Sequence, residues 1–249
     1  MKNDPIVARR DQSFVWVIFD PKKPFFDGLS KPSVARLMYL ATFIGKEGVI
    51  ENTNSDRTGR PLTQKEIVKR LACSEQTFWR FVKEVKEAGI LSSEHGVYRL
   101  ALKHFRKGML TSEEIAAIWS RREVITRLYI GAMRSLYDSS SPNLVSSLSY
   151  LFRMMPFVNR EYNVVTTNPF EEDIFRDEPM SMGDFADIVG YRRSHMSHLC
   201  GVLESLRFMA DDGPAPVIRQ ICAVRGKTER IFWWIDPRLY YGGTQLLSW

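Results

Sequence analysis

The stretch PLTQKEIVKRLACSEQTFWRFVKEVKEAGIL, residues 61–91, predicts two consecutive helices. Thr63 followed three residues later by Glu66 is typical of a capping box, so the first helix is expected to begin there. Ser74 is an N-cap residue for the second helix, and Gly89 is typical of a helix end. The apolar side chains of the second helix share one face: Phe78, Phe81, Val82 and Val85. Two helices joined by a short turn form a helix-turn-helix.

A β-hairpin is expected directly after this helix pair. The run ILSSEHGVYRLAL, residues 90–102, contains two short β-prone segments around a polar turn at Gly96. A hairpin in this position corresponds to the wing of a winged helix, which is a variant of the helix-turn-helix DNA reader.

A second copy of the pattern follows 118 residues later. At that offset Pro61–Thr63 coincides with Pro179–Ser181, and the apolar positions of both helices coincide as well. A longer second hairpin is expected from Val217 to Ile235, because the two runs are rich in β-branched and aromatic residues. Its turn is expected at Arg225–Thr228.

Further helices are expected at Pro32–Ile44 and Asn143–Met155, and a long helix is expected at Leu110–Leu136, beginning with a capping box. The sequence therefore predicts an α+β, mainly helical fold of two tandem winged helix-turn-helix domains joined by a helix. The expected boundaries are a flexible N-terminus at residues 1–12, a first domain at 13–109, a connecting helix at 110–137 and a second domain at 138–249.

The composition favours an anionic partner. The chain of 249 residues carries 35 Lys and Arg against 29 Asp and Glu, a net charge of +6. Its three cysteines are odd in number and widely spaced, which indicates a reducing compartment rather than a disulfide framework. Since no apolar run approaches the length of a membrane span, we expect a bacterial cytoplasmic or nucleoid protein and no membrane partner.

The residues expected to contact DNA lie at the start of each second helix, because that end of a helix-turn-helix enters the major groove. In the second copy they are Arg192, Arg193, Ser194, His195, Ser197 and His198, and its wing adds Arg225, Lys227 and Arg230. In the first copy they are Ser74, Gln76, Thr77, Arg80 and Lys83. Trp79 in the first copy indicates a protein contact as much as a base contact, so the second copy is the stronger candidate.

No metal, cofactor or catalytic residue is expected. His195 and His198 share a helix face, but Cys200 points elsewhere and the four ligands of a structural zinc site are not found. The phosphate-loop, dinucleotide-binding and nucleophile-elbow motifs are absent from the sequence. The acidic run at 171–173 is interpreted as a solvated linker rather than a magnesium site. Tyr240 and Tyr241 are interpreted as packing, stacking or dimer-contact residues rather than nucleophiles.

Three segments carry a resemblance to a known family. LTQKEIVKRLACSEQTFWRFVKEVKEAGIL followed by HGVYRLALKHFRKG resembles the winged-helix region of plasmid replication proteins of the RepL type. RIFWWIDPRLYYGG, residues 230–243, resembles their closing strand and N-P-x-x-x-x-x-G ending, with Asp236 in place of the asparagine. The tandem arrangement resembles theta-type plasmid initiators, which implies binding to iterated origin repeats and dimerisation through one module.

The sequence thus predicts a sequence-specific protein that binds double-stranded DNA and acts as a replication initiator of a plasmid or phage. Two modules in succession imply a repeated or bipartite site of about two helical turns. A transcriptional regulator, such as a repressor, of a mobile element remains an alternative, as does a winged-helix protein-interaction module. The expected partners are double-stranded DNA, a second copy of the chain, and the replication or transcription machinery.

Overall fold

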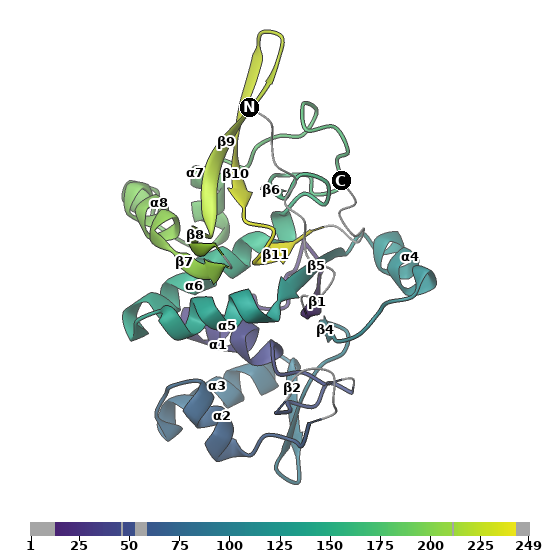
Figure 1. The fold of residues 1–249 in the computed structure, drawn as a ribbon, viewed down its shortest axis with the longest axis vertical. Coiled ribbons are helices and arrows are strands. Elements are labelled where there is room, and N and C mark those ends of the chain that lie inside the picture. Colours follow the sequence, from purple (N-terminus) through teal and green to yellow (C-terminus); the bar gives the residue numbers. More distant parts are fainter. Residues whose placement is uncertain (1–12, 46, 53–58, 211, 243–249) are drawn as a thin grey trace.

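A computed structural model of the chain describes residues 13–45, 47–52, 59–210 and 212–242. The N-terminus predicted to be flexible, residues 1–12, lies outside these ranges. The prediction of a mainly helical pair of tandem winged helix-turn-helix domains joined by a helix is wrong. The described residues form a mixed fold of eight α-helices and four small antiparallel sheets, with 38% helix and 26% strand (Figure 1).

The largest sheet was not predicted. Its strand order is β11-β5-β1-β4, and every pairing in it is antiparallel. The strands are β1 (Phe14–Phe19), β4 (Phe105–Arg106), β5 (Val124–Tyr129) and β11 (Tyr240–Tyr241). Strand β1 pairs with β5 along its whole length, from Phe14 opposite Tyr129 to Phe19 opposite Val124. The sheet therefore joins segments from the beginning, the middle and the end of the chain.

The long connecting helix predicted at Leu110–Leu136 is replaced by three elements. These are α4 (Ser112–Ser120), strand β5 and α5 (Ile130–Ser139). Helix α4 does begin with the predicted capping box of Thr111 and Glu114, but Arg122 adopts a positive φ of 56° and the helix ends before it. In β5, Ile125 packs on one face of the sheet with Trp16, whereas Val124 and Leu128 join the main core on the other. That alternation is the period of a strand.

The first predicted helix pair and hairpin form at the expected residues. The elements are α1 (Lys31–Ala41), α2 (Gln64–Arg70), α3 (Glu75–Glu87), β2 (Leu91–Glu94) and β3 (Val97–Leu100). Thr63 and Glu66 make the complete capping box of α2, and the Ser74 hydroxyl caps α3. Positive φ angles at His95 and Gly96 turn β2 into β3, as a two-residue hairpin requires.

The second half contains a longer series of elements. They are α6 (Pro142–Met154), η1 (Met155–Phe157), β6 (Val164–Val165), α7 (Met182–Ile188), η2 (Arg193–His195), α8 (Met196–Ser205), β7 (Arg207–Ala210), β8 (Gly213–Pro216), β9 (Ile218–Arg225) and β10 (Thr228–Ile235). Helix α7 begins and ends 118 residues after α2, so the offset seen in the sequence holds at this pair. The predicted long hairpin forms as β9 and β10, and β6 extends it to three strands.

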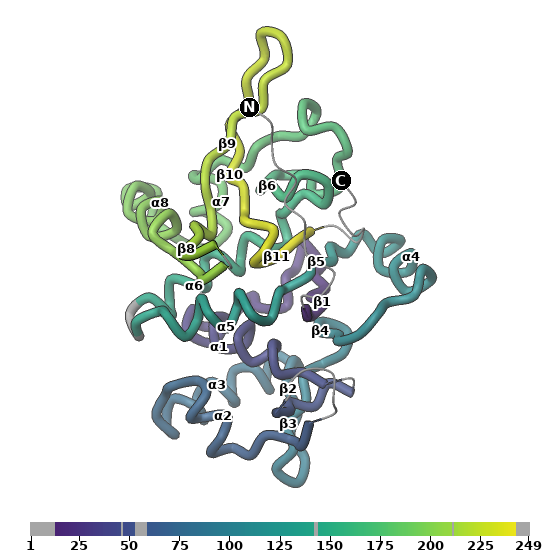
Figure 2. Tube along the Cα trace, viewed as in Figure 1, coloured from purple at the N-terminus to yellow at the C-terminus, as the bar shows by residue number. Residues whose placement is uncertain are grey.

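The core lies around the packed helices α1 and α6, and one cluster of buried side chains runs through both halves of the chain. In Figure 1, α3 and α8 lie on the same side of the molecule, with the turn between α5 and α6 between them. The hairpin β2–β3 extends from one end of the molecule and β9–β10 from the opposite end, as the tube in Figure 2 also shows. No helix of the described ranges combines the length and the apolar character that crossing a membrane requires.

Candidate nucleic-acid interface

Helix α3 presents one exposed polar face. Gln76, Arg80 and Lys83 are all exposed and lie at i, i+4 and i+7, so they share a side of the helix. The opposite side buries Phe78, Phe81, Val82 and Val85. Burial of that apolar stripe fixes the direction in which the three polar side chains point. The structure therefore brings together three of the five residues predicted in this copy.

Ser74 and Thr77, the other two residues of this copy, cap the helix. The Ser74 hydroxyl accepts from the Thr77 backbone N–H at 3.2 Å and donates to the Thr77 hydroxyl at 3.0 Å. Replacement of such a cap typically costs about 1 kcal/mol of stability. These two side chains hold the end of α3 in position, and a contact with DNA would come in addition to that role.

Trp79 lies beside this polar face with 51% of its surface exposed. Its neighbour Phe78 is buried and meets the indole edge to face, with 5.4 Å between ring centroids. An exposed indole on this face can stack on a base or pack against another protein, as expected from the sequence.

The second helix pair differs from the first at its turn. Residues Arg193–His195 form the 3₁₀ turn η2, and α8 begins only at Met196. The reason is the missing cap: Arg192 stands at the position that Ser74 has in the first pair, and its side chain does not cap the turn. The predicted start of the recognition helix is thus a tight turn that precedes the helix.

The predicted contacts around this turn are exposed. They are Arg192, Arg193, Ser194, His195, Ser197 and His198. Leu199 and Leu203 are buried behind them, which orients α8 as the sequence predicted. The polar set is therefore together on the surface, on the outer side of the turn and of the first turn of α8.

Arg193 has an intramolecular role that the sequence did not indicate. Its guanidinium donates to the Asp187 carboxylate, from Nε at 3.0 and 3.1 Å and also from Nη2, and it lies 3.8 Å from Asp184. The hydrogen bonds from Arg193 lower the pKa of Asp187 below its usual value. Arg193 therefore ties η2 to α7, and much of its charge is compensated before any ligand arrives.

Arg225, near the tip of the second hairpin, is also held by an acidic partner. Its guanidinium lies 3.1 and 3.2 Å from the two carboxylate oxygens of Asp173 and 4.1 Å from the centre of the Phe175 ring. The pKa of Asp173 is lowered by a hydrogen bond from the Phe175 backbone and by Arg225. Asp173 belongs to the acidic run at 171–173 that was predicted to be a solvated linker, and this part of the chain thus packs against the hairpin.

Arg230 and Lys227 have opposite surroundings on the same hairpin. Arg230 is half-buried and donates to the backbone carbonyl of Asp177. Lys227 is exposed beside the turn at Gly226, and among the described residues it forms no ion pair. Of the three predicted cations of this hairpin, Lys227 is thus the one whose charge is fully available to a ligand.

The face of the hairpin opposite Arg225 and Arg230 carries two exposed apolar side chains, which were not predicted from the sequence. Val224 and Ile231 are 59% and 61% exposed, and alternation along β9 and β10 places them on the face opposite Arg225 and Arg230. Residues 221–232, ICAVRGKTERIF, do not alternate between apolar and polar side chains, so the sequence gives no signal for this face, and only the packing of Asp173 and Phe175 against Arg225 shows which face is free.

The structure also bears on the metal and enzyme alternatives. Within the described ranges, no group of three or more His, Cys, Asp or Glu side chains is placed to hold a metal ion. Tyr240 is fully buried and burial raises its pKa well above the usual range, so its hydroxyl is neither accessible nor ionised as a nucleophile would need to be. Tyr241 is 5% exposed, and both tyrosines serve the packing of β11 against β5.

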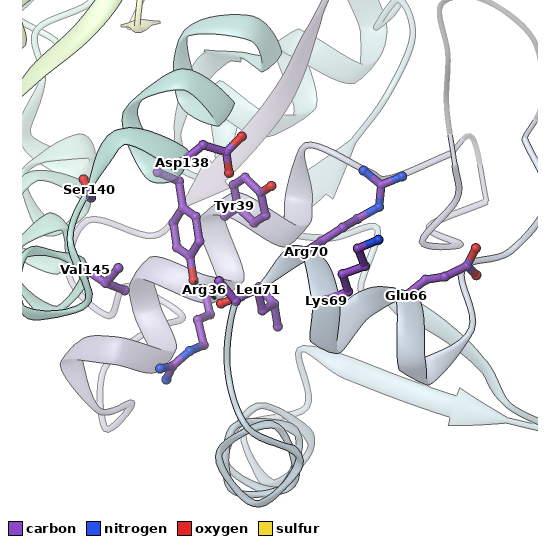
Figure 3. Close-up of a pocket in the computed structure, with 11 residues that line it drawn as sticks. Arg36, Tyr39, Glu66, Lys69, Arg70, Leu71, Asp138, Ser140 and Val145 are labelled. Carbon is purple, nitrogen blue, oxygen red and sulfur yellow. Dashed lines mark hydrogen bonds between the residues drawn. The ribbon is translucent and has the colours of Figure 1, made fainter.

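Three cations that the sequence reading did not select line a cavity of about 660 Å³ beside the first helix pair. Arg36 comes from α1, and Lys69 and Arg70 come from the last turn of α2 (Figure 3). Tyr39 and Asp138 also line it, so the cavity adjoins the turn between α5 and α6. No spacing in the sequence could have found this group, because its members come to line one cavity only through tertiary packing.

The chain was compared with protein families, curated proteins and solved structures, and no family model, curated protein or solved structure matches it.

Proposed function

We propose that the chain binds double-stranded DNA, with the polar face of α3 and the turn before α8 reaching into the grooves. The observation that carries this proposal is that α3 and α8, which carry these exposed donors, lie on one side of the molecule, while the two hairpins extend at opposite ends (Figure 1). A duplex is long enough to contact both surfaces and a hairpin together. The net charge of +6 supports a polyanionic ligand.

The exposed side chains suit different contacts on a duplex. The Gln76 amide can read adenine with two hydrogen bonds, and Arg80 can read guanine or bind a phosphate. Lys83 and Lys227 are suited to phosphates, since an ammonium carries charge but little directional information. We infer that α3 supplies base contacts and that the second hairpin supplies backbone contacts.

Two groove contacts in succession imply a bipartite or repeated site of about two helical turns. Binding should weaken steeply with salt, because each neutralised phosphate releases counterions. Arg193 and Arg225 would contribute to this salt dependence only after exchanging their carboxylate partners for phosphates.

As the biological role we propose replication initiation on a plasmid or phage, supported by the resemblance of residues 62–91, 95–108 and 230–243 to plasmid replication proteins. Regulation of transcription in a mobile element uses the same contacts and is the alternative. The two roles are distinguished by testing whether an origin fragment that carries the DNA site bound by this chain replicates. The initiator role requires that replacement of Gln76, Arg80 and Lys83 by alanine abolishes replication of that fragment.

The experiment that tests duplex binding is selection of bound sites from a random duplex pool, followed by affinity measurements on the selected site. We expect a defined consensus, with affinity reduced at least tenfold in Arg80→Gln combined with Lys83→Gln. Lys103→Gln, an exposed lysine outside both surfaces, is the matched control and should leave affinity within about twofold. Recovery of no consensus and equal affinity of all three proteins for any duplex would contradict the proposal.

A second candidate function is contact with another protein, favoured by the exposed Trp79, Val224 and Ile231. These side chains suit an interface, because aromatic and aliphatic groups are enriched at the centres of interfaces. Measurement of the mass in solution for the wild type and for Ile231→Ser tests self-association through the hairpin. A monomeric wild type at high micromolar concentration would exclude this form of the second function.

A further inference from the structure

The cavity beside the first helix pair has an unbalanced charge. Lys69 and Arg70 form no ion pair with a carboxylate among the described residues, whereas Arg36 has an electrostatic attraction to Glu84, which does not line the cavity. The cavity also contains two carboxylates, Glu66 and Asp138, and both have other partners. Because these two acids are engaged elsewhere, Lys69 and Arg70 line the cavity without full compensation of their charge.

The partners of the two acids explain why they do not neutralise the cavity. Glu66 is bound by the Arg60 guanidinium, with one N–O distance of 2.9 Å, and accepts from the Thr63 backbone N–H at 2.9 Å as part of the capping box. Asp138 accepts a hydrogen bond from the Tyr39 hydroxyl, and burial together with this acid raises the pKa of Tyr39. Both acids therefore have fixed structural roles at the rim.

Arg70 is held in place by two contacts. Its Nη2 donates to the Asn52 side-chain oxygen at 2.8 Å, and its guanidinium lies 4.6 Å from the centre of the Phe43 ring. Figure 3 shows Lys69 and Arg70 extending together from α2 on one side of Tyr39, with Arg36 on the other side. A planar guanidinium and an adjacent ammonium form a suitable pair of donors for a phosphate group.

Arg36 adds a further, independent feature. Its Nε atom is buried and has no hydrogen-bond partner, whereas the guanidinium also contacts the Tyr137 hydroxyl. A buried donor without an acceptor is unfavourable, and buried polar groups are nearly always satisfied. The basic residues at the end of α2 also suit the helix dipole, whereas Arg36 lies in the middle of α1, where the dipole does not favour a cation.

We propose that this cavity binds phosphate groups, through Lys69 and Arg70 at one end and Arg36 at the other. Its volume of about 660 Å³ exceeds that of a single phosphate, so the ligand is a phosphorylated molecule or consecutive phosphates of a nucleic-acid backbone. The site adjoins Leu71 and Ala72 in the turn before α3, and its occupancy would therefore bias the position of that helix. The proposal does not depend on duplex binding, because free phosphate has the same chemistry.

The test uses inorganic phosphate as the probe for the full-length protein. We expect calorimetric titration at constant ionic strength to give saturable phosphate binding, and phosphate but not chloride to raise the Tm. Lys69→Gln and Arg70→Gln should each weaken phosphate binding at least fivefold. Lys65→Gln removes an exposed lysine from the same helix outside the cavity, and it should bind phosphate as the wild type does.

Repeating the phosphate titration in the presence of duplex DNA then identifies the source of the phosphate. If saturating duplex blocks the titration and Lys69→Gln weakens duplex binding, the occupant is the DNA backbone. If phosphate and duplex bind together, the occupant is a small phosphorylated molecule, and both results support the site. Saturable phosphate binding without any duplex binding would reject the proposed function and retain the site. The proposed phosphate site would be overturned if phosphate and chloride raised the Tm equally. It would also be overturned if Lys65→Gln and Lys69→Gln weakened phosphate binding equally.

Discussion

The Arg225 guanidinium is bound by both carboxylate oxygens of Asp173, at 3.1 and 3.2 Å, although the two residues are 52 positions apart. Phe175 lies against the same guanidinium. A cation expected to bind DNA is thus held by an acidic segment of its own chain, and a duplex must compete with Asp173 for it.

Replacement of Asp173 by Asn should therefore strengthen duplex binding. The change removes one negative charge beside the second hairpin and releases Arg225, so we expect a three- to tenfold gain in affinity at low salt, decreasing as salt is raised. Fluorescence anisotropy across a salt series measures this effect. Glu178→Gln removes an exposed acid of the same segment that forms no ion pair among the described residues, and it is the control for the loss of charge alone. Equal affinities of Asp173→Asn and the wild type at low salt would show that Arg225 does not reach DNA.

Asp187→Asn tests the corresponding contact of Arg193. Since Arg193 donates to Asp187 and thereby ties η2 to α7, the variant should lower the Tm while leaving Arg193 free for a phosphate. Arg193→Gln should lower the Tm similarly but also weaken duplex binding. In the double variant the Tm should fall no further than in either single variant, because both remove the same interaction. Additive losses in the double variant would contradict this coupling.

The sequence supported accurate predictions of local structure. The capping boxes at Thr63 and Thr111, the cap at Ser74 and the hairpin turn at Gly96 all depend on residues within a few positions of one another. Helix ends and tight turns are decided at this range. The offset of 118 residues between the two helix pairs was likewise visible without any long-range information.

The central sheet was missed because its decisive interactions are distant. Strand β5 was predicted as helix, since Val124, Ile125 and Leu128 also fit a helical stripe, and only the pairing with β1 more than 100 residues away resolves the choice. The same limit applies to the candidate site. That Arg225 has an acidic partner 52 residues away, and that Arg36 and Lys69 line one cavity, follows from tertiary packing alone.

His104 should make stability depend on pH. Burial lowers its pKa to about 4, and the ring packs against Phe25 with 4.5 Å between centroids. The unfolded chain binds a proton near the ordinary value of about 6.5, so stability is complete above that pH and falls as the pH decreases toward about 4. Urea unfolding at several pH values measures this slope. His104→Gln should flatten it in that window, whereas His95→Gln, at an exposed hairpin turn, should leave it unchanged. An unchanged slope in His104→Gln would assign the dependence to other groups.

Asn163 should be critical for the attachment of the C-terminal strand. Its side chain donates to the backbone carbonyls of Ile235 at 2.9 Å and Tyr240 at 3.0 Å, and accepts from the Gly242 N–H at 2.9 Å. Asn163→Ala leaves these buried groups unsatisfied, so we expect a loss of about 2–4 kcal/mol in the free energy of unfolding. Asn163 also has a positive φ of 55°, which glycine adopts without strain but alanine does not. Asn163→Gly therefore removes the hydrogen bonds without adding backbone strain, and the further loss in Asn163→Ala measures that strain. A loss below about 1 kcal/mol in both variants would show that these bonds do not anchor β11.

The most direct test of duplex binding through both helix pairs is a hydroxyl-radical footprint on the selected site. We expect two protected backbone regions on one face of the duplex. One should be lost in Arg80→Gln combined with Lys83→Gln, and the other in Arg192→Gln combined with His198→Gln. A single protected region that responds to only one of these pairs, or no protection at saturating protein, would contradict it.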